Sequence, residues 1–332
     1  MTAPTVSVLM AVHNGEAFLA DAVAGVLAQT GPSFEFIIID DGSGDKTAEM
    51  LASLTDPRII TRRNADNLGL TASLNIGLKM ARGEFIARMD VDDQSLPGRL
   101  EAQVEALARS GASICFCRCL IADEATGGEK ERREPDWPLV RWRVLFDNAF
   151  GAHSAAMFRR QAIIDAGGYD EGFRYAQDYD LWDRCLTRGL EFVYEPKPLL
   201  RFCAHRQSIT SLRAKEQAEA ARVVSIRALK RAFDNVPEDE LAGLRWLMTG
   251  YDFPRQPGAV DAALHGCLKR AGRFSAPSVW KDAASRLARR LKDLDGARRR
   301  TAVRRMLEAA VRSRSATALA RSVYAMFFPG RV

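Results

Sequence analysis

The first 120 residues alternate short apolar runs with segments of helical periodicity, and this alternation limits what the chain can fold into. Repeats of an apolar run and a helical segment are typical of βαβ units, in which helices cover a mostly parallel sheet. We therefore expect an α/β fold. The expected strands are residues 5–12, 34–39, 59–61, 85–89 and 112–121, and the expected helices are residues 16–29, 48–54, 70–81 and 99–110.

The later part of the chain has a different pattern. Residues 123–138 are rich in charge, Pro and Gly, so we expect a loop there. Beyond residue 205 the pattern is entirely helical, with an interruption at residues 252–258. We place a boundary near Leu212, which predicts one domain over residues 1–212 and a helical region over residues 213–332.

Composition narrows the class of protein. A chain of 332 residues with 47% hydrophobic residues can bury a sizeable core. We see no secretory signal pattern and no apolar run near the ~18 residues of a membrane span, so we expect a cytoplasmic protein. Cys115, Cys117 and Cys119 alternate along one strand-like run without zinc-type spacing, which predicts buried reduced thiols.

Positive charge is concentrated at the end of the chain. Residues 281–332 hold fourteen Lys and Arg against four Asp and Glu, and the rest of the chain is mildly acidic. The basic helical pattern there is typical of segments that bind an anionic membrane surface, and equally of helices that pack on a domain with a solvated basic face. Nucleic acid is a poor fit, because the basic stretch has almost no interleaved aromatic residues.

Three carboxylates follow the expected strand at residues 85–89. In extended geometry Asp90 and Asp92 project to the same side, and Asp93 begins the turn. Ligands usually bind at the carboxyl ends of strands in open α/β sheets, and paired carboxylates suit a hard divalent cation that shares its remaining positions with phosphate oxygens. Taken alone, the D-x-D pattern also fits a solvated turn.

A second acidic turn, I-I-I-D-D-G-S-G-D-K-T, spans residues 37–47. A P-loop needs G-x-x-x-x-G-K-[ST], and Asp45 occupies the place of the second glycine, which excludes that interpretation. A carboxylate at a strand end can instead accept hydrogen bonds from a base or a ribose. The alternative is a plain turn that begins a helix.

Several motifs in order give the chain a family resemblance. P-T-V-S-V-L-M-A-V-H-N-G, I-I-I-D-D-G-S, N-L-G-L-T-A-S-L-N-I-G-L, A-R-G-E-F-I-A-R-M-D-V-D-D with L-P-x-R-L, and G-G-Y-D-E-G-F-R-Y-A-Q-D-Y-D-L-W together resemble glycosyltransferase family 2. The resemblance covers residues 4–212 and implies an inverting, nucleotide-sugar-dependent enzyme. It further implies a GT-A fold, in which a Rossmann-like, mixed and mostly parallel sheet is flanked by helices. Residues 1–212 would then be the catalytic domain, and residues 213–332 a basic helical C-terminal region.

The resemblance also assigns roles to individual residues. Asp178, in the Q-D pair where the family usually has Glu-Asp, corresponds to the general base that deprotonates the acceptor hydroxyl. Gln177 replaces the usual Glu, and Asp180 is the alternative base. The implied nucleotide-sugar contacts are Val12 and Asn14 beside His13, Asp41 rather than Asp40, Asn67, Gly69, Arg88 and Asp90; the implied metal ligands are Asp92 and His205, with Asp93 as a supporting acid. His153 is either a residue of the acceptor side or a structural histidine.

These assignments predict a metal-assisted single displacement. The implied donor is a UDP-, GDP- or dTDP-sugar, the cofactor Mn²⁺ or Mg²⁺, and the acceptor a glycan or lipid-linked glycan of cell-surface polysaccharide assembly. The Q-x-x-R-W segment of processive members is absent, so we expect transfer of one or a few sugars, in the cytoplasm or at the inner membrane face. The alternatives are a nucleotidyltransferase and a non-catalytic nucleotide-sugar-binding protein.

Overall fold

The computed structural model describes residues 3–123, 128–132, 137–204, 213–233 and 236–250, together with residues 282, 283, 285, 286 and 289. The chain divides into two compact units. Unit 1 comprises residues 1–134 and 150–217, and unit 2 comprises residues 135–149 and 218–332. The domain boundary near Leu212 stays a prediction.

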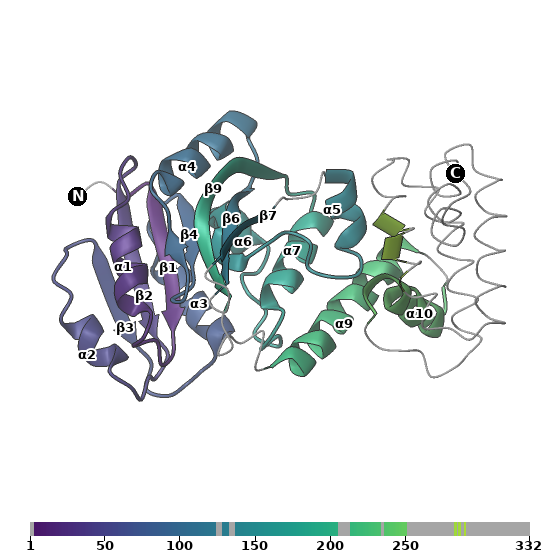
Figure 1. Ribbon diagram of the computed structural model, residues 1–332, viewed down its shortest axis with the longest axis horizontal. Helices are drawn as coiled ribbons and strands as arrows, with labels where there is room; N and C mark the ends of the chain where they lie inside the picture. Colours follow the sequence, from purple (N-terminus) through teal and green to yellow (C-terminus); the bar gives the residue numbers. More distant parts are fainter. Residues whose placement is uncertain are drawn as a thin grey trace. The chain divides into compact units, whose positions relative to one another are not determined.

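Unit 1 is built on one mixed sheet with the strand order β3-β2-β1-β4-β8-β6-β9-β5, and β7 pairs with β6 at its side (Figure 1). Parallel pairs join β1 to β2 and β4, β2 to β3, and β6 to β9, while the remaining pairs are antiparallel. The strands are β1 (Val6–Val12), β2 (Phe34–Asp40), β3 (Ile59–Arg63), β4 (Phe85–Met89), β5 (Gln94–Ser95), β6 (Ile114–Asp123), β7 (Gly128–Arg132), β8 (Ala156–Arg159) and β9 (Phe192–Ala204).

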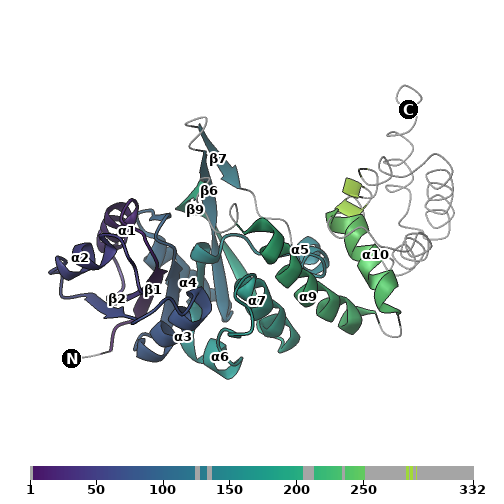
Figure 2. The same ribbon diagram turned by 90° about the horizontal axis from the view of Figure 1, so that it is seen from below.

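Helices cover both faces of this sheet. The chain passes from β1 through α1, β2 and α2 to β3 and returns to β4 through α3, and these crossovers join parallel strands. Figure 2 shows α1 and α3 on opposite sides of the sheet. The described helices of unit 1 are α1 (Leu19–Leu27), α2 (Thr47–Ala52), α3 (Leu70–Met80), α4 (Arg99–Ser110), the short η1 (His153–Ala155), α6 (Arg160–Asp165) and α7 (Gln177–Thr187); α9 (Ala214–Ala232) begins in this unit.

The central strands form the core because their sequences are apolar on both faces. Every residue of β1 is buried, and so is every residue of β4. A strand covered by helices on both faces reads as a continuous apolar run rather than an alternating one, which is why β1, β2 and β4 could be predicted. Their parallel arrangement puts the carboxyl ends of these three strands at one edge of the sheet.

One expected loop is partly a strand. Residues 128–132 were expected within a loop, and they form β7, which pairs antiparallel with β6 from Cys119 to Asp123. Backbone hydrogen bonding to a neighbouring strand does not require apolar side chains, and charged residues are common on strands at the edge of a sheet. The charge of this segment therefore did not exclude a strand.

The described part of unit 2 is helical. It contains α5 (Trp137–Arg143), most of α9 and α10 (Glu238–Thr249). The hydroxyl of Ser225 on α9 donates a hydrogen bond of 2.7 Å to the carbonyl oxygen of Leu145, which fastens α9 to the segment that contains α5. Among the helices of the described ranges, none combines the length and the apolar character needed to cross a membrane.

Candidate active site

The loop after β1 is tied to the loop after β2. Asn14 adopts a positive φ of 55°, a left-handed conformation that Asn tolerates better than most residues. Its backbone N–H donates to the Ser43 hydroxyl at 2.9 Å, and its side-chain oxygen accepts from the Gly44 N–H at 2.8 Å. Val12, the preceding predicted contact, is 2% exposed and closes β1 beneath this turn.

Asp41 organises the neighbouring loop through its carboxylate. One oxygen accepts from the Asn64 amide at 2.8 Å and from the Leu68 N–H at 2.9 Å. The other accepts from the Gly69 N–H at 2.8 Å. Asn67 lies in the same loop with an exposed side chain. The predicted residues Asp41, Asn67 and Gly69 are thus brought together, and Asp41 holds the loop in place.

Asp40 lies behind this turn. It is 2% exposed, and one carboxylate oxygen accepts from the Ser43 N–H at 2.9 Å. Its other oxygen lies 3.5 Å from Nε of Arg63. Both carboxylates of the D-D pair therefore stabilise this region: Asp40 bonds within the turn, and Asp41 bonds to the neighbouring loop. The sequence pattern alone could not assign these two roles.

A buried arginine supports the carboxylates after β4. Arg88 has no exposed surface, and its Nη2 donates to Asp90 Oδ1 at 2.5 Å. Arg99, also buried, donates from Nη2 to the Arg88 carbonyl oxygen at 2.8 Å and to the Ser154 carbonyl oxygen at 2.6 Å. Arg99 belongs to the L-P-x-R-L motif, and its position explains that motif, because it fastens the end of β4 to Ser154 in η1.

The three acids of the D-V-D-D turn occupy different environments. Asp93 is 1% exposed and accepts hydrogen bonds from the Ser154 hydroxyl and from the Cys203 N–H. Burial, followed by the charges of Asp90 and Asp92, raises the pKa of Asp93 well above its usual range. The pKa of Asp90, whose side chain is 30% exposed, is raised mainly by burial, and Arg88 opposes that rise. Asp92 is partly exposed.

This turn has the chemistry of a site for a hard cation that is shared with a substrate. Within the described ranges, no group of three or more His, Cys, Asp or Glu side chains is arranged to hold a metal. A magnesium-type site needs only one or two carboxylates, because waters and phosphate oxygens supply the other ligands. Asp92 fits that requirement, since its charge raises the pKa values of both neighbouring acids and a cation would relieve that repulsion. His205, the other predicted ligand, lies outside the described residues.

Asp178 lies in the first turn of α7. Ala176, the residue just before the helix, has a left-handed φ of 54°, a costly conformation for a residue with a Cβ atom. Backbone strain of this kind gathers at functional sites. The partly exposed Asp178 accepts from the Tyr179 N–H at 2.8 Å, while its neighbour Gln177 is 8% exposed.

Asp180 is engaged in a buried ion pair. It has no exposed surface, and its Oδ2 accepts from Nε of Arg184 at 2.8 Å. The same guanidinium donates to the carbonyl oxygens of Ala166 at 2.7 Å and Gly168 at 2.8 Å. Asp180 therefore anchors the loop before Tyr169, which favours Asp178 over Asp180 as the reacting carboxylate.

A buried His–Tyr pair connects the two groups of acids. Nε2 of His153 lies 2.8 Å from the hydroxyl of Tyr169, and both side chains are buried. Burial first, then the charge of Arg88, lowers the pKa of His153 well below its usual value. Burial raises the pKa of Tyr169; the charge of Arg88 opposes that rise, and the charges of Asp178 and Asp90 add to it. The charges of both carboxylates therefore act on the same buried phenol, which links the start of α7 and the end of β4 electrostatically.

Sequence reasoning missed several residues that build this site. Asn75 on α3 brackets Tyr169, because it donates to the Tyr169 carbonyl oxygen at 2.8 Å and accepts from its N–H at 3.0 Å. Asn75 belongs to the N-L-G-L-T-A-S-L-N run. A polar residue on an otherwise buried stripe of that helix was the sequence feature that could have identified it. Asn64 and Ser154 gave no such signal, since their partners lie far away in the sequence.

The fold of the chain resembles that of a solved glycosyltransferase structure. A crystal structure of S. aureus TarS, residues 1–349 in complex with UDP-GlcNAc, superimposes with a TM-score of 0.59 at 14% sequence identity. The likeness covers 97% of this chain and 91% of that chain. The expected fold class, a GT-A sheet flanked by helices, is confirmed.

Sequence comparisons give the family. The family model described as glycosyl transferase family 2 matches residues 7–168. An uncharacterized glycosyltransferase of Methanocaldococcus jannaschii, MJ1057, is 32% identical over 207 residues, which cover 61% of this chain and 71% of the relative. The Escherichia coli O-antigen biosynthesis glycosyltransferase WbnJ is 33% identical over 208 residues, which cover 61% of this chain and 81% of the relative. The chain is therefore a glycosyltransferase and belongs to glycosyltransferase family 2.

Proposed function

We propose that this enzyme is an inverting glycosyltransferase that moves a sugar from a nucleoside diphosphate to a hydroxyl group of an acceptor. The proposal rests on two carboxylates, Asp90 and Asp178, whose charges both act on the buried phenol of Tyr169, the partner of His153. One carboxylate comes from the turn that follows β4, and the other comes from the start of α7. A single displacement needs a base on the acceptor side and compensation of the charge that develops on the leaving diphosphate.

The donor side is the edge formed by the loops after β1, β2 and β4. Asn14, Asp41 and Asp90 lie in these three loops, and Asn67 and Gly69 lie in the loop that Asp41 holds. Ligands of α/β sheets bind at such an edge. The TarS complex contains UDP-GlcNAc, which supports a nucleotide-sugar donor for this fold. A UDP-sugar is thus the first donor to test, followed by GDP- and dTDP-sugars.

Arg88 supports the donor side from the protein interior. Because it is buried and bonded to Asp90, it orients that carboxylate and offsets its charge. A Mn²⁺ or Mg²⁺ ion held by Asp92, with His205 as the predicted second ligand, would offset the charge that develops on the leaving diphosphate. Asp93 stays behind the turn, where Ser154 and Cys203 fix it.

The acceptor hydroxyl is activated by Asp178 in this proposal. Its oxygen attacks the anomeric carbon from the face opposite the diphosphate and forms the new glycosidic bond. The bond from the anomeric carbon to the diphosphate oxygen breaks, and the proton of the hydroxyl passes to the Asp178 carboxylate. Attack from the opposite face inverts the configuration at that carbon. Gln177, where the family usually has Glu, leaves this base in place.

The acceptor belongs to cell-surface polysaccharide assembly in this proposal. WbnJ takes its name from O-antigen biosynthesis, which supports a glycan or a lipid-linked glycan as the acceptor class. A lipid-linked acceptor gives the basic region at residues 281–332 a use, because such a region is attracted to anionic lipids. We therefore propose a cytoplasmic enzyme that works at the inner face of the membrane.

A panel of nucleotide sugars tests the reaction class. The full-length protein is incubated with Mn²⁺, each donor and a lipid-phosphate or oligosaccharide acceptor, and released nucleoside diphosphate is measured. We expect release from one donor, and an inverted anomeric configuration in the product by NMR. Release of pyrophosphate instead would indicate nucleotidyl transfer. Donor binding with no turnover for any acceptor or water would indicate a non-catalytic binding protein, and a retained configuration would exclude the single displacement.

A further inference from the structure

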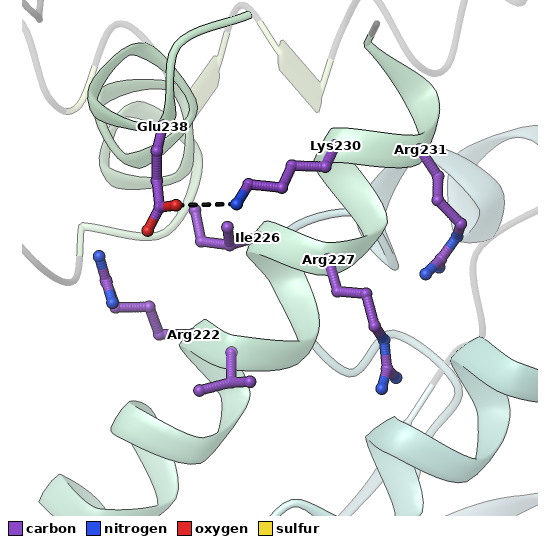
Figure 3. A pocket seen from close by; sticks show the side chains of 7 residues that line it. Arg222, Ile226, Arg227, Lys230, Arg231 and Glu238 are labelled. Carbon is purple, nitrogen blue, oxygen red and sulfur yellow. Dashed lines mark hydrogen bonds and ion pairs between the residues drawn. The ribbon is translucent and has the colours of Figure 1, made fainter.

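A basic groove runs along α9 in unit 2, remote in sequence from the residues of the candidate active site. It has a volume of about 690 Å³. Figure 3 shows its side chains, which come from α9 and from the first residue of α10. The residues that line it, here called the α9 groove, are Arg222, Val223, Ile226, Arg227, Lys230, Arg231 and Glu238.

The spacing of these residues makes one continuous face. Residues 222, 223, 226, 227, 230 and 231 recur at intervals of three and four, which places them on one side of an α-helix. Four of the six are cations. Figure 3 shows Lys230 pointing toward Glu238, and Arg227 and Arg231 directed away from it. Among the described residues that line the groove, cations therefore outnumber acids.

Glu238, the acid among the described lining residues, is already compensated. Glu238 accepts a hydrogen bond from Nζ of Lys230 at 2.8 Å. This contact lowers the pKa of Glu238, and the charge of Arg222 acts in the same direction. The acid is thus bonded to Lys230 and lies under the electrostatic influence of Arg222.

The groove also has an apolar component. Val223 is 55% exposed, one of the few large apolar side chains that the described residues present to solvent, and Ile226 is 7% exposed at the floor. Exposed apolar groups beside arginines suit a ligand that has both an anionic and an apolar part. Arg guanidinium groups bind phosphate oxygens through two parallel hydrogen bonds. A soluble phosphate compound would gain nothing from Val223.

We propose that the α9 groove binds the phosphate headgroup of an anionic phospholipid and so docks the enzyme on a membrane. Its volume lies within the ~300–1,000 Å³ of small-molecule sites, which is room for a whole headgroup. The cations bind the phosphate, and Val223 contacts the first carbons of the lipid. The inference rests on the proposed lipid-linked acceptor for its use in the cell, but vesicle binding can be measured without any transfer.

Vesicle co-sedimentation of the full chain tests the proposal. One set of vesicles holds about seven parts phosphatidylcholine to three parts phosphatidylglycerol, and the other holds phosphatidylcholine alone. We expect binding to the anionic set only. The double variant Arg222→Gln/Arg231→Gln should weaken that binding at least about tenfold. The matched control Lys79→Gln/Arg109→Gln removes two exposed cations of unit 1. Its vesicle binding should stay within about twofold of that of the wild type.

A second pair of variants tests the apolar part. Val223→Glu should weaken vesicle binding, because it places a carboxylate where the lipid enters. Ile164→Glu adds the same charge at an apolar position on α6 that is 39% exposed. This control should leave vesicle binding unchanged. Nucleotide-sugar binding by unit 1, followed by thermal shift, should be retained in all four variants.

Three outcomes would overturn the proposal. The first is equal vesicle binding by the groove variants and their controls. The second is saturable binding of glycerol 3-phosphate in a thermal-shift assay without binding to vesicles, which would assign the groove to a soluble phosphate ester. The third is a lack of preference for anionic vesicles. Because the donor-binding readout is separate, none of these outcomes depends on the proposed transfer reaction.

Discussion

Gly42 lies so close to Asp66 that a Cβ atom at position 42 would come within 2.7 Å of the Asp66 carbonyl carbon. Gly42 follows the D-D pair at the end of β2, and its φ of 67° is left-handed. The same Cβ atom would lie 2.9 Å from the Asn67 backbone nitrogen. The I-D-D-G-S turn and the N-L-G loop therefore touch through their backbones, and only glycine permits this contact.

Gly42→Ala should weaken donor binding. The added methyl group must push the loop at residues 66–67 away from the β2 turn, which misplaces Asn67 and the hydrogen bonds that Asp41 makes to the loop. We expect the donor Kd to rise at least about tenfold, which corresponds to ~1.4 kcal/mol of binding free energy. Isothermal titration with the active donor measures it.

Gly111→Ala is the matched control for that change. Gly111 has a similar positive φ of 72°, but a Cβ atom there would meet nothing within 4 Å. The control variant carries the same backbone strain without the steric contact, so its donor Kd should stay near that of the wild type. Equal weakening by both variants would contradict the role assigned to the Gly42 contact.

Replacing Asp180 should lower the free energy of unfolding more than replacing Asp178. Asp180→Ala leaves the Arg184 guanidinium without its buried carboxylate and should lower the free energy of unfolding by about 3 kcal/mol. Asp178→Ala removes a partly exposed side chain bonded to one N–H, so about 1 kcal/mol is expected. Urea denaturation of both variants measures the difference. A larger loss for Asp178→Ala would reverse the roles assigned to the two acids.

His153 should make the protein less stable in acid. Its folded pKa lies well below its unfolded value of about 6.5, so both states are neutral above that pH. Below it, only the unfolded state takes up a proton, and the free energy of unfolding falls by up to ~1.4 kcal/mol per pH unit. His153→Gln removes this contribution and should flatten the pH dependence between about pH 5 and 6.5.

Urea denaturation followed by tryptophan fluorescence can measure that pH dependence, because the His153 ring packs against Trp182 at 6.0 Å between ring centroids. The comparison uses the slope against pH rather than the absolute stability, since the substitution also changes packing. Parallel slopes for the wild type and His153→Gln would show that His153 takes up its proton in the folded protein.

Asp92→Ala should remove the metal dependence of donor binding. The wild type is expected to bind the donor more tightly with Mn²⁺ than with EDTA, by at least about tenfold. The variant should bind equally weakly in both conditions. Asp21→Ala, which removes an exposed acid from α1, is the control and should keep the wild-type difference. A variant at Asp92 that retained metal-dependent binding would exclude this residue as the metal ligand.

Sequence patterns predicted those strands and helices whose own apolar residues show which face is buried. The strand at Phe85–Met89 and the helix at Arg99–Ser110 have the predicted bounds, because each is a complete apolar run or amphipathic stripe between clear breaks. The edge at which the loops gather also followed from the sequence, since parallel strands end together. Asn14, Asp41 and Asp90 lie there.

The strands and contacts that the sequence did not predict depend on partners far away in the chain. β9 was not expected, and it contains two prolines, at positions 196 and 198, that interrupt any strand pattern. The structure accommodates them at a register shift against β6, between Cys117 and Cys119, where a ladder N–H is not required. Asp93 has two partners, Ser154 in η1 and Cys203 in β9, that sequence reasoning could not find, because the fold brings them to the turn after β4 from far along the chain.

The most direct test of the account is the Asp178→Asn variant, measured for transfer and for donor binding in the same preparation. Asn keeps the shape of the side chain and its ability to accept from the Tyr179 N–H, but it cannot take the acceptor's proton. Loss of a general base typically costs 10²–10⁴-fold in rate, so we predict a fall of about that size in kcat with an unchanged donor Kd. A variant that transfers sugar at the wild-type rate would contradict Asp178 as the base and with it the proposed mechanism.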